Sequence, residues 1–164
     1  MTPYEDYLYN GIAELKEQGA DVIIACCHWG IERTYYPNDY QQNLAHGLID
    51  AGADLVIGNH PHVLQGVEVY NGKVICYSLG NFCFGANRNP NDKDTMIFQQ
   101  TFTFVDGELQ SDIDADIIPC TLSSTDSYND FKPTVVGATL AGRPLHIHHA
   151  LNLSDLFHNF CDLS

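Results

Sequence analysis

The sequence is poor in basic residues. Only 7 of its 164 residues are Lys or Arg, against 21 Asp or Glu, which gives a formal net charge of -14. A surface this acidic argues against nucleic acid or an anionic membrane surface as a partner, because both carry negative charge. An anionic substrate stays open, since a bound divalent cation reverses the local field.

Several chemical motifs are also missing. No Cys-x-x-Cys pair occurs among the six cysteines, so neither a zinc nor a redox motif is indicated. There is no Gly-rich phosphate loop and no nucleophile elbow. No signal peptide or apolar run of membrane-spanning length is present, and the chain is expected to be soluble and cytoplasmic by default. The cysteines are expected to be buried and reduced, with Cys26 and Cys27 on opposite faces of a strand.

Two similar sequence segments are the most informative feature that is present. Each begins with Gly-Ala-Asp, continues through a Val- and Ile-rich run, and ends in histidine: His28 after the first, His60 and His62 after the second. The apolar runs are typical of fully buried strands. The residues between them fit a crossover helix, which would make the strands parallel and bring their carboxyl ends to one edge. Ligands bind at that edge in open α/β sheets.

Local signals predict the remaining elements. Thr2 and Asn38 each open a capping box ahead of an apolar helical stripe. Asn71-Gly72 and Asp106-Gly107 lie between apolar runs and predict two hairpins. The stretch Leu151–Leu163 fits a short terminal helix. This order of elements indicates an α/β fold class.

The three imidazoles are candidate metal ligands. His60-x-His62 would place two rings on one side of an extended segment, with Pro61 stiffening it and Gly58 letting the backbone turn. His28 would reach the same edge from the neighbouring strand, and neutral imidazole binds divalent transition metals. The alternative is that these histidines satisfy backbone groups at the strand ends.

Neighbouring residues have weaker claims. Glu32 lies close in sequence, but a loop acid of this kind is more often solvated or paired with Arg33. Asn81 follows a strand and could orient a ligand or cap its turn. Trp29 could shield a pocket or belong to the core, and His46 is expected to be a packing or surface residue.

These residues lie in motifs that resemble the bacterial capsule synthesis protein A family, whose members are also called poly-gamma-glutamate biosynthesis proteins. The resemblance runs from about Tyr4 to about Pro133. Members of the family are similar in fold to calcineurin-like metallophosphatases. The motifs are His28-Trp29-Gly30 followed by Glu32, Gln41 ahead of Leu44-Ala45, the run from Leu48 to Gln65, and the run from Tyr77 to Phe82.

The resemblance implies a four-layer sandwich, in which helices flank two β-sheets, and a metal-dependent phosphoesterase-like hydrolase of capsule or poly-gamma-glutamate biosynthesis. It implies His28, His60 and His62 as metal ligands, and His28 and Asn81 are the candidate catalytic residues. The cofactors would be divalent ions (Mn, Fe or Zn), two in the complete domain, and a metal-activated hydroxide would attack phosphorus. An alternative is a non-catalytic component that handles an anionic polymer during synthesis or export.

The resemblance also implies that residues 1–133 are the carboxyl-terminal half of such a domain, followed by a divergent tail at 134–164. The half that supplies the acidic ligands would be missing, so metal binding is expected to be weak and the chain inactive alone. A half sandwich would expose apolar sheet faces and unpaired strand edges. Expected partners are therefore a second copy or a chain supplying the missing half, with an anionic small molecule or polymer as substrate. Family members are often membrane-anchored and extracellular.

Overall fold

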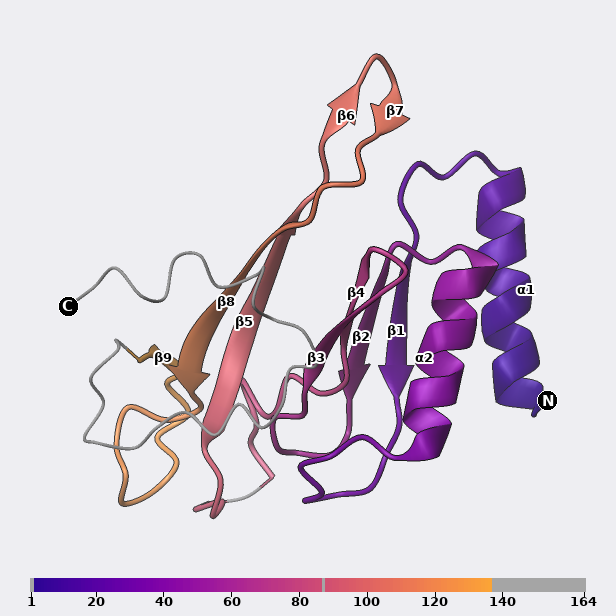
Figure 1. Ribbon diagram of the computed structural model, residues 1–164. Helices are drawn as coiled ribbons and strands as arrows, with labels where there is room; N and C mark the ends of the chain where they lie inside the picture. The colour runs from indigo at the N-terminus through magenta and orange to yellow at the C-terminus, as the bar shows by residue number, and fades with distance from the viewer. Residues whose placement is uncertain (1, 87, 137–164) are drawn as a thin grey trace.

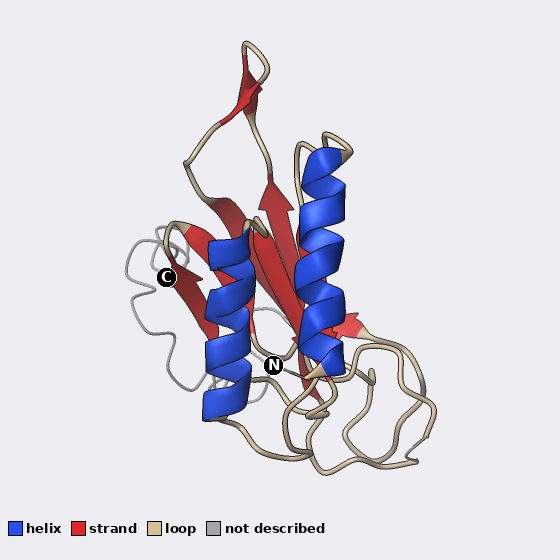
Figure 2. Ribbon diagram, turned by 90° about the vertical axis from the view of Figure 1, so that its right-hand side faces the viewer, coloured by secondary structure: helices blue, strands red, loops and turns tan. Residues whose placement is uncertain are grey.

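The computed structural model describes residues 2–86 and 88–136, which form three layers. Two helices cover one face of a four-stranded sheet, and a second sheet packs against the other face (Figures 1 and 2). This is a mixed α/β architecture, as the sequence predicts. Neither helix in the described part combines the length and the apolar character needed to cross a bilayer.

Both helices begin at the predicted caps. Helix α1 (Pro3–Glu17) is capped by Thr2, whose hydroxyl accepts from the Glu5 N–H while the Glu5 carboxylate accepts from the Thr2 N–H. Helix α2 (Asp39–Ala51) repeats this arrangement with Asn38 and the Gln41 side chain. Each box satisfies backbone donors that a helix start leaves without partners. The predicted starts of both helices are therefore confirmed.

The first sheet contains the two Gly-Ala-Asp strands. Its order is β1 (Ile24–His28), β2 (Leu55–Asn59), β4 (Lys73–Cys76) and β3 (Val67–Tyr70). Strands β1, β2 and β4 are parallel, so the predicted parallel pair is confirmed. Strand β3 pairs antiparallel with β4 through the predicted Asn71-Gly72 turn, in which both residues have positive φ.

Strand β1 is not fully buried, and that prediction is wrong. It lies at the edge of the sheet, and its residues alternate between exposed and buried. Ala25 and Cys27 face the helices, whereas Ile24 is 48% exposed and Cys26 is also exposed. The second sheet covers the neighbouring strands, which leaves this face of β1 open. The two adjacent cysteines do point to opposite faces, as predicted, but Cys26 and Cys83 are not buried.

The second sheet has the order β5 (Asp94–Thr101), β8 (Asp114–Thr121) and β9 (Thr134–Val135). The antiparallel pairing of β5 with β8 confirms the predicted pair. The pair continues into a short hairpin, β6 (Phe104–Val105) and β7 (Glu108–Leu109), which projects beyond the first sheet in Figure 1. Because β9 pairs with β8, the first residues of the predicted tail belong to this sheet. The predicted helix Leu151–Leu163 lies outside the described residues.

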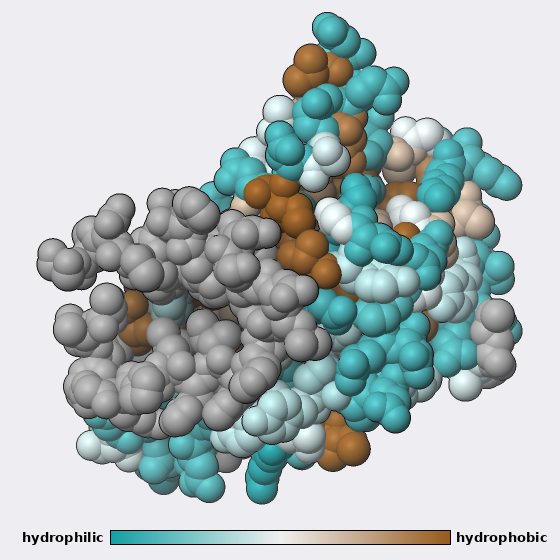
Figure 3. Space-filling model, in the orientation of Figure 1, coloured by the Kyte–Doolittle hydropathy of each residue, from teal (hydrophilic) through white to brown (hydrophobic). Residues whose placement is uncertain are grey.

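Two apolar clusters hold these layers together. The helix-side core lies between the helices and the first sheet, and the inter-sheet core lies between the two sheets. The surface in Figure 3 is mostly hydrophilic, with apolar atoms on the projecting hairpin, where Phe104 and Val105 are exposed. The helix-side core includes Ile12, Trp29, Leu44, Leu48, Ile49, Val56 and Ile75; the inter-sheet core includes Leu55, Val67, Val74, Cys76, Met96 and Ile117.

Asp54 joins three strands at the end of the first sheet that lies away from the histidines. Its carboxylate accepts from the Ile23 N–H at 2.9 Å and from Lys73 Nζ at 2.7 Å. The aspartate of the second Gly-Ala-Asp segment therefore has a structural role and does not reach the histidine edge.

Candidate functional site

The histidines lie at the carboxyl ends of β1 and β2, where two neighbouring turns follow the strands. His28 ends β1 and is aligned with Asn59, which ends β2. The Trp29 N–H donates to the Asn59 carbonyl at 3.1 Å, and the Arg33 N–H donates to the Pro61 carbonyl at 2.7 Å. The turn after β1 is therefore bonded to the turn after β2 at two points, so the two turns are held in a fixed relative position.

The segment His60-Pro61-His62 is not extended, and the predicted reason for bringing its two rings together is wrong. His60 has φ 103° and His62 has φ 60°, so the backbone turns sharply at both residues. The ring centroids are nevertheless 6.0 Å apart. Non-glycine residues rarely adopt positive φ, and such strained residues cluster at functional sites.

Gly58 also has a different role from the predicted one. It lies within β2 in an ordinary strand conformation, so it does not turn the backbone. A Cβ there would lie 2.1 Å from the Tyr77 carbonyl oxygen and 2.4 Å from Trp29 Nε1. Gly58 therefore makes room for the Trp29 indole, which donates to that carbonyl at 2.9 Å. Trp29 is buried in the helix-side core, which confirms the core interpretation of this residue.

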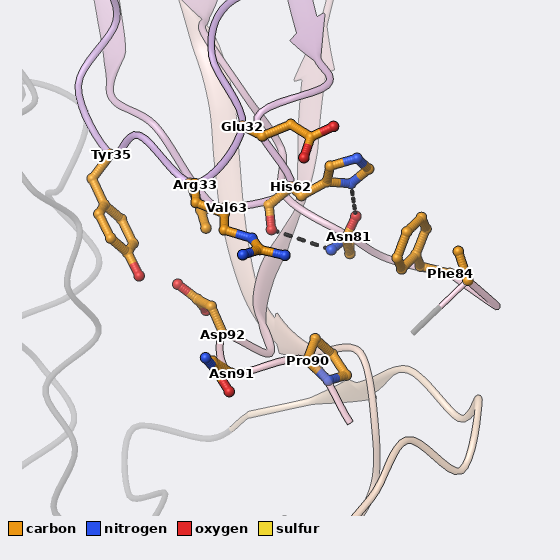
Figure 4. A pocket seen from close by; sticks show the side chains of 11 residues that line it. Glu32, Arg33, Tyr35, His62, Val63, Asn81, Phe84, Pro90, Asn91 and Asp92 are labelled. Atoms are coloured by element: carbon orange, nitrogen blue, oxygen red, sulfur yellow. Dashed lines mark hydrogen bonds between the residues drawn. The ribbon is translucent and has the colours of Figure 1, made fainter. Parts of the chain in front are cut away.

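Within the described residues, the structure brings together a ligand set that differs from the predicted three histidines. Ligand atoms of Glu32, His60 and His62 all lie within 4.8 Å of one another. His28 is next to this group, with its ring centroid 4.7 Å from that of His60. Figure 4 shows the Glu32 carboxylate beside the His62 ring. The sequence interpretation gave Glu32 only a weak claim, because the distance of Glu32 from the histidines depends on how the loop after β1 folds.

Asn81 contacts His62 with both ends of its amide. Asn81 Nδ2 donates to the His62 backbone carbonyl at 3.2 Å, which turns Oδ1 toward ring Nδ1 of His62 at 2.8 Å. An amide oxygen only accepts hydrogen bonds, so Nδ1 of the neutral ring carries the proton. The lone pair is then on Nε2, the atom free to bind a ligand. In this structure Asn81 is a positioning residue for His62.

Replacing Asn81 with leucine removes both hydrogen bonds at similar volume. We expect His62 to lose its Nδ1-protonated preference, and any divalent metal affinity of the site to fall by about 10- to 100-fold. Nitrogen-15 NMR of the histidine rings measures the first effect, and metal titration measures the second. Asn81→Asp is the matched control, because it keeps an acceptor for Nδ1; equal spectra for wild type and Asn81→Leu would contradict the assignment.

Two buried glutamines hold the loop that carries Glu32. Gln41 Nε2 donates to Gln65 Oε1 at 2.8 Å, and Gln65 Nε2 donates to the carbonyls of Thr34 and Tyr36 at 2.7 and 3.3 Å. Gln41 is 1% exposed and Gln65 is 5% exposed. The network connects the start of α2 to the loop that carries Glu32 and to the segment that follows His62. Sequence reasoning missed this role because it depends on contacts between residues far apart in the chain.

A cavity of about 470 Å³ opens beside the ligand set. Figure 4 shows Glu32, Arg33, His62 and Asn81 on one side of it and Tyr35, Asn91 and Asp92 around the rest. A hydrogen bond to the Asp92 carboxylate raises the pKa of Tyr35, and partial burial adds to this. Tyr35 therefore stays a neutral hydroxyl at physiological pH.

Other sequence candidates are structural. His46 stacks on Tyr70 with centroids 3.9 Å apart and bonds to Glu68 at 3.0 Å, which confirms its packing role. Burial raises the pKa of Cys27 to about 11, so this thiol is a poor metal ligand or nucleophile at neutral pH.

The comparisons with known proteins agree on one family. A model described as "Bacterial capsule synthesis protein PGA_cap" matches residues 2–86. The "PGA biosynthesis protein CapA" of Bacillus subtilis (strain 168) is 55% identical over 73 residues, which are 44% of this chain and 19% of that protein. The "Capsule biosynthesis protein CapA" of Bacillus anthracis is 48% identical over 69 residues, 42% of this chain and 17% of that protein. The aligned part thus spans less than a fifth of either relative.

Proposed function

Because that model covers more than half of the chain, the chain belongs to the bacterial capsule synthesis protein PGA_cap family, and we propose that it provides a metal-dependent, phosphoesterase-like hydrolase site for capsule or poly-gamma-glutamate synthesis. The observation that carries the proposal is the convergence of Glu32, His60 and His62 within 4.8 Å beside an open cavity. The names of the relatives suggest capsule or poly-gamma-glutamate synthesis as the process, and the donor set suggests metal-dependent hydrolysis as the chemistry.

The donor set fits a divalent transition metal. Two imidazoles and one carboxylate are the ligands that Zn, Fe and Mn sites use, and three protein ligands leave a position open for substrate. When bound, such an ion acts as a Lewis acid toward a phosphoryl oxygen. His28, beside His60, is the fourth candidate ligand and the nearest candidate for moving a proton. The donors in the described residues suffice for one ion, so we expect at most one per chain, bound weakly.

Three residues outside the ligand set would support this site. Asn81 fixes the tautomer of His62, and the Gln41–Gln65 pair holds the loop that carries Glu32. The cavity gives a substrate access to the open side of the ligand set. We further propose that the layers belong to a calcineurin-like sandwich, which is supported by two packed sheets with helices outside one of them.

Metal titration and hydrolysis of a generic aryl phosphate test the proposal together. We expect the wild-type chain to bind Mn²⁺ or Zn²⁺, and His60→Ala to lose both binding and any hydrolysis. The matched control is His46→Ala, which removes an imidazole that lies on α2 and contacts Glu68 instead. Binding without hydrolysis would favour a non-catalytic component that handles an anionic polymer. Unchanged metal binding in His60→Ala would refute the metal site.

We also propose that the open edge of β1 pairs with a further strand, from a second copy or from a chain that supplies additional layers. Among residues 2–86 and 88–136, strand β1 has a partner on one side only, and Ile24 on its uncovered face is 48% exposed. Edges of this kind pair readily unless charge blocks them.

Light scattering tests whether the open edge of β1 pairs with another chain. We expect the wild-type chain to be associated at micromolar concentration, and Ile24→Lys to shift it toward monomer, because a charged side chain disfavours edge pairing. Tyr7→Lys is the control, since Tyr7 is 74% exposed and belongs to helix α1, so the change adds the same charge outside strand β1. A stable, monodisperse wild-type monomer would contradict the proposal.

A further inference from the structure

Arg33 is the cation of the cavity beside the ligand set. Figure 4 shows its guanidinium pointing into the cavity, on the same side as His62 and Asn81. The chain as a whole has few basic residues and a net charge of -14. A guanidinium in this position therefore makes a local exception to an acidic surface.

The guanidinium of Arg33 has no carboxylate partner within residues 2–86 and 88–136. The ion pairs recorded there are His46–Glu68 and Lys73–Asp54. Three lysines are occupied structurally: Lys16 donates to the Ala51 carbonyl, Lys73 to Asp54, and Lys93 to the carbonyls of Thr125 and Asp126. Unlike these lysines, Arg33 makes no side-chain hydrogen bond within the described part of the chain, which leaves its donors available to a ligand.

The backbone of Arg33 is held firmly in an uncommon conformation. Its φ is 61°, and its N–H donates to the Pro61 carbonyl at 2.7 Å. The following residue is fixed by the Gln65 side chain, which donates to the Thr34 carbonyl. A non-glycine residue keeps a positive φ only where its surroundings impose it. The side chain therefore starts from a fixed point between the two turns of the site.

We propose that Arg33 binds an oxyanion, a carboxylate or a phosphate group, of the ligand that occupies this cavity. A guanidinium matches such groups with two parallel hydrogen bonds. Asp92 lines another part of the cavity and disfavours an anionic group beside itself, so a ligand would place an oxyanion at Arg33. This inference deepens the proposed function by naming the charge of the ligand. Binding of the oxyanion by Arg33 does not require the metal site; only a reaction of the bound ligand at Glu32, His60 and His62 rests on the proposed function.

The test uses metal-free protein with a chelator present, so that it does not depend on the metal site. Inorganic phosphate and glutarate are titrated at low ionic strength and followed by NMR. We expect Arg33→Gln to weaken binding of the preferred anion by at least about tenfold, with Arg33→Lys in between. Arg88→Gln is the matched control, because Arg88 does not line the cavity. Tighter binding of phosphate identifies a phosphoryl ligand, and tighter binding of glutarate a carboxylate ligand.

Three outcomes would overturn the inference: no binding of either anion by the wild-type chain, equal binding by Arg33→Gln, or an equal loss in Arg88→Gln. The His62→Ala variant separates this inference from the proposed function. If His62→Ala loses metal binding but keeps anion binding, both hold. If the wild-type chain binds no metal and Arg33→Gln still loses the anion, the inference stands and the hydrolase proposal fails.

Discussion

The Gly58→Val variant is expected to be unfolded or aggregated at room temperature. A Cβ at this position would lie 2.1 Å from the Tyr77 carbonyl oxygen and 2.4 Å from Trp29 Nε1. The carbonyl belongs to the backbone and cannot move aside without disrupting the adjoining strand, and the Trp29–Tyr77 hydrogen bond would be lost. We expect a cost of more than about 4 kcal/mol, a large part of the total stability of a domain this size.

Circular dichroism and urea unfolding measure this effect. Gly11→Ala in helix α1 is the matched control, because a Cβ there meets nothing within 4 Å. The control should gain up to about 1 kcal/mol, since alanine favours helix more than glycine does. A Gly58→Val variant with a cooperative transition near that of the wild-type chain would show that β2 and β4 do not pack as described.

The Glu32→Gln variant is expected to lose divalent metal binding while keeping the fold. It replaces a carboxylate oxygen ligand with a neutral amide of the same shape, and Glu32 is exposed, so its loss leaves the core unchanged. We expect affinity to fall by more than about 100-fold, the upper range for residues that only support a ligand. Any metal-dependent hydrolysis should fall with it. Calorimetric titration with Mn²⁺ and Zn²⁺ measures the loss.

Comparison with His28→Ala decides between two ligand sets. If Glu32, His60 and His62 hold the ion, His28→Ala should weaken binding less than Glu32→Gln does. If the three imidazoles hold it, the order should reverse. Glu17→Gln, at an exposed position in the last turn of α1, is the charge control and should bind as the wild-type chain does. Wild-type affinity in Glu32→Gln would remove Glu32 from the site.

The sequence predicts well the elements whose signals are local. Thr2 and Asn38 lie within three residues of the side chains that complete their capping boxes, and both helices begin there. Asn71-Gly72 and Asp106-Gly107 sit at their hairpin turns because few other residues accept positive φ at adjacent positions. The parallel pairing of β1 with β2 also follows, because a crossover helix leaves little alternative.

The features that the sequence misses depend on contacts between distant segments. Whether Ile24 is covered depends on how far the second sheet extends over the first, which no pattern within β1 records. The conformation of His60 and His62 is imposed by neighbouring turns, and His-x-His spacing alone suggested an extended segment. Glu32 becomes a candidate ligand only because its loop is held by Gln65, 33 positions further along the chain.

The in-register alignment of β1 with β2 links the distant parts of the molecule to the site. Cys27 lies opposite Gly58 and His28 opposite Asn59, and each strand runs directly into one of the two ligand-bearing turns. A slip of one position would displace these turns by about 3.3 Å, whereas metal coordination tolerates roughly 0.2 Å. The affinity of this chain for a metal ion should therefore be sensitive to the alignment of β1 with β2. Small shifts between these strands should lower that affinity well before the fold itself is lost.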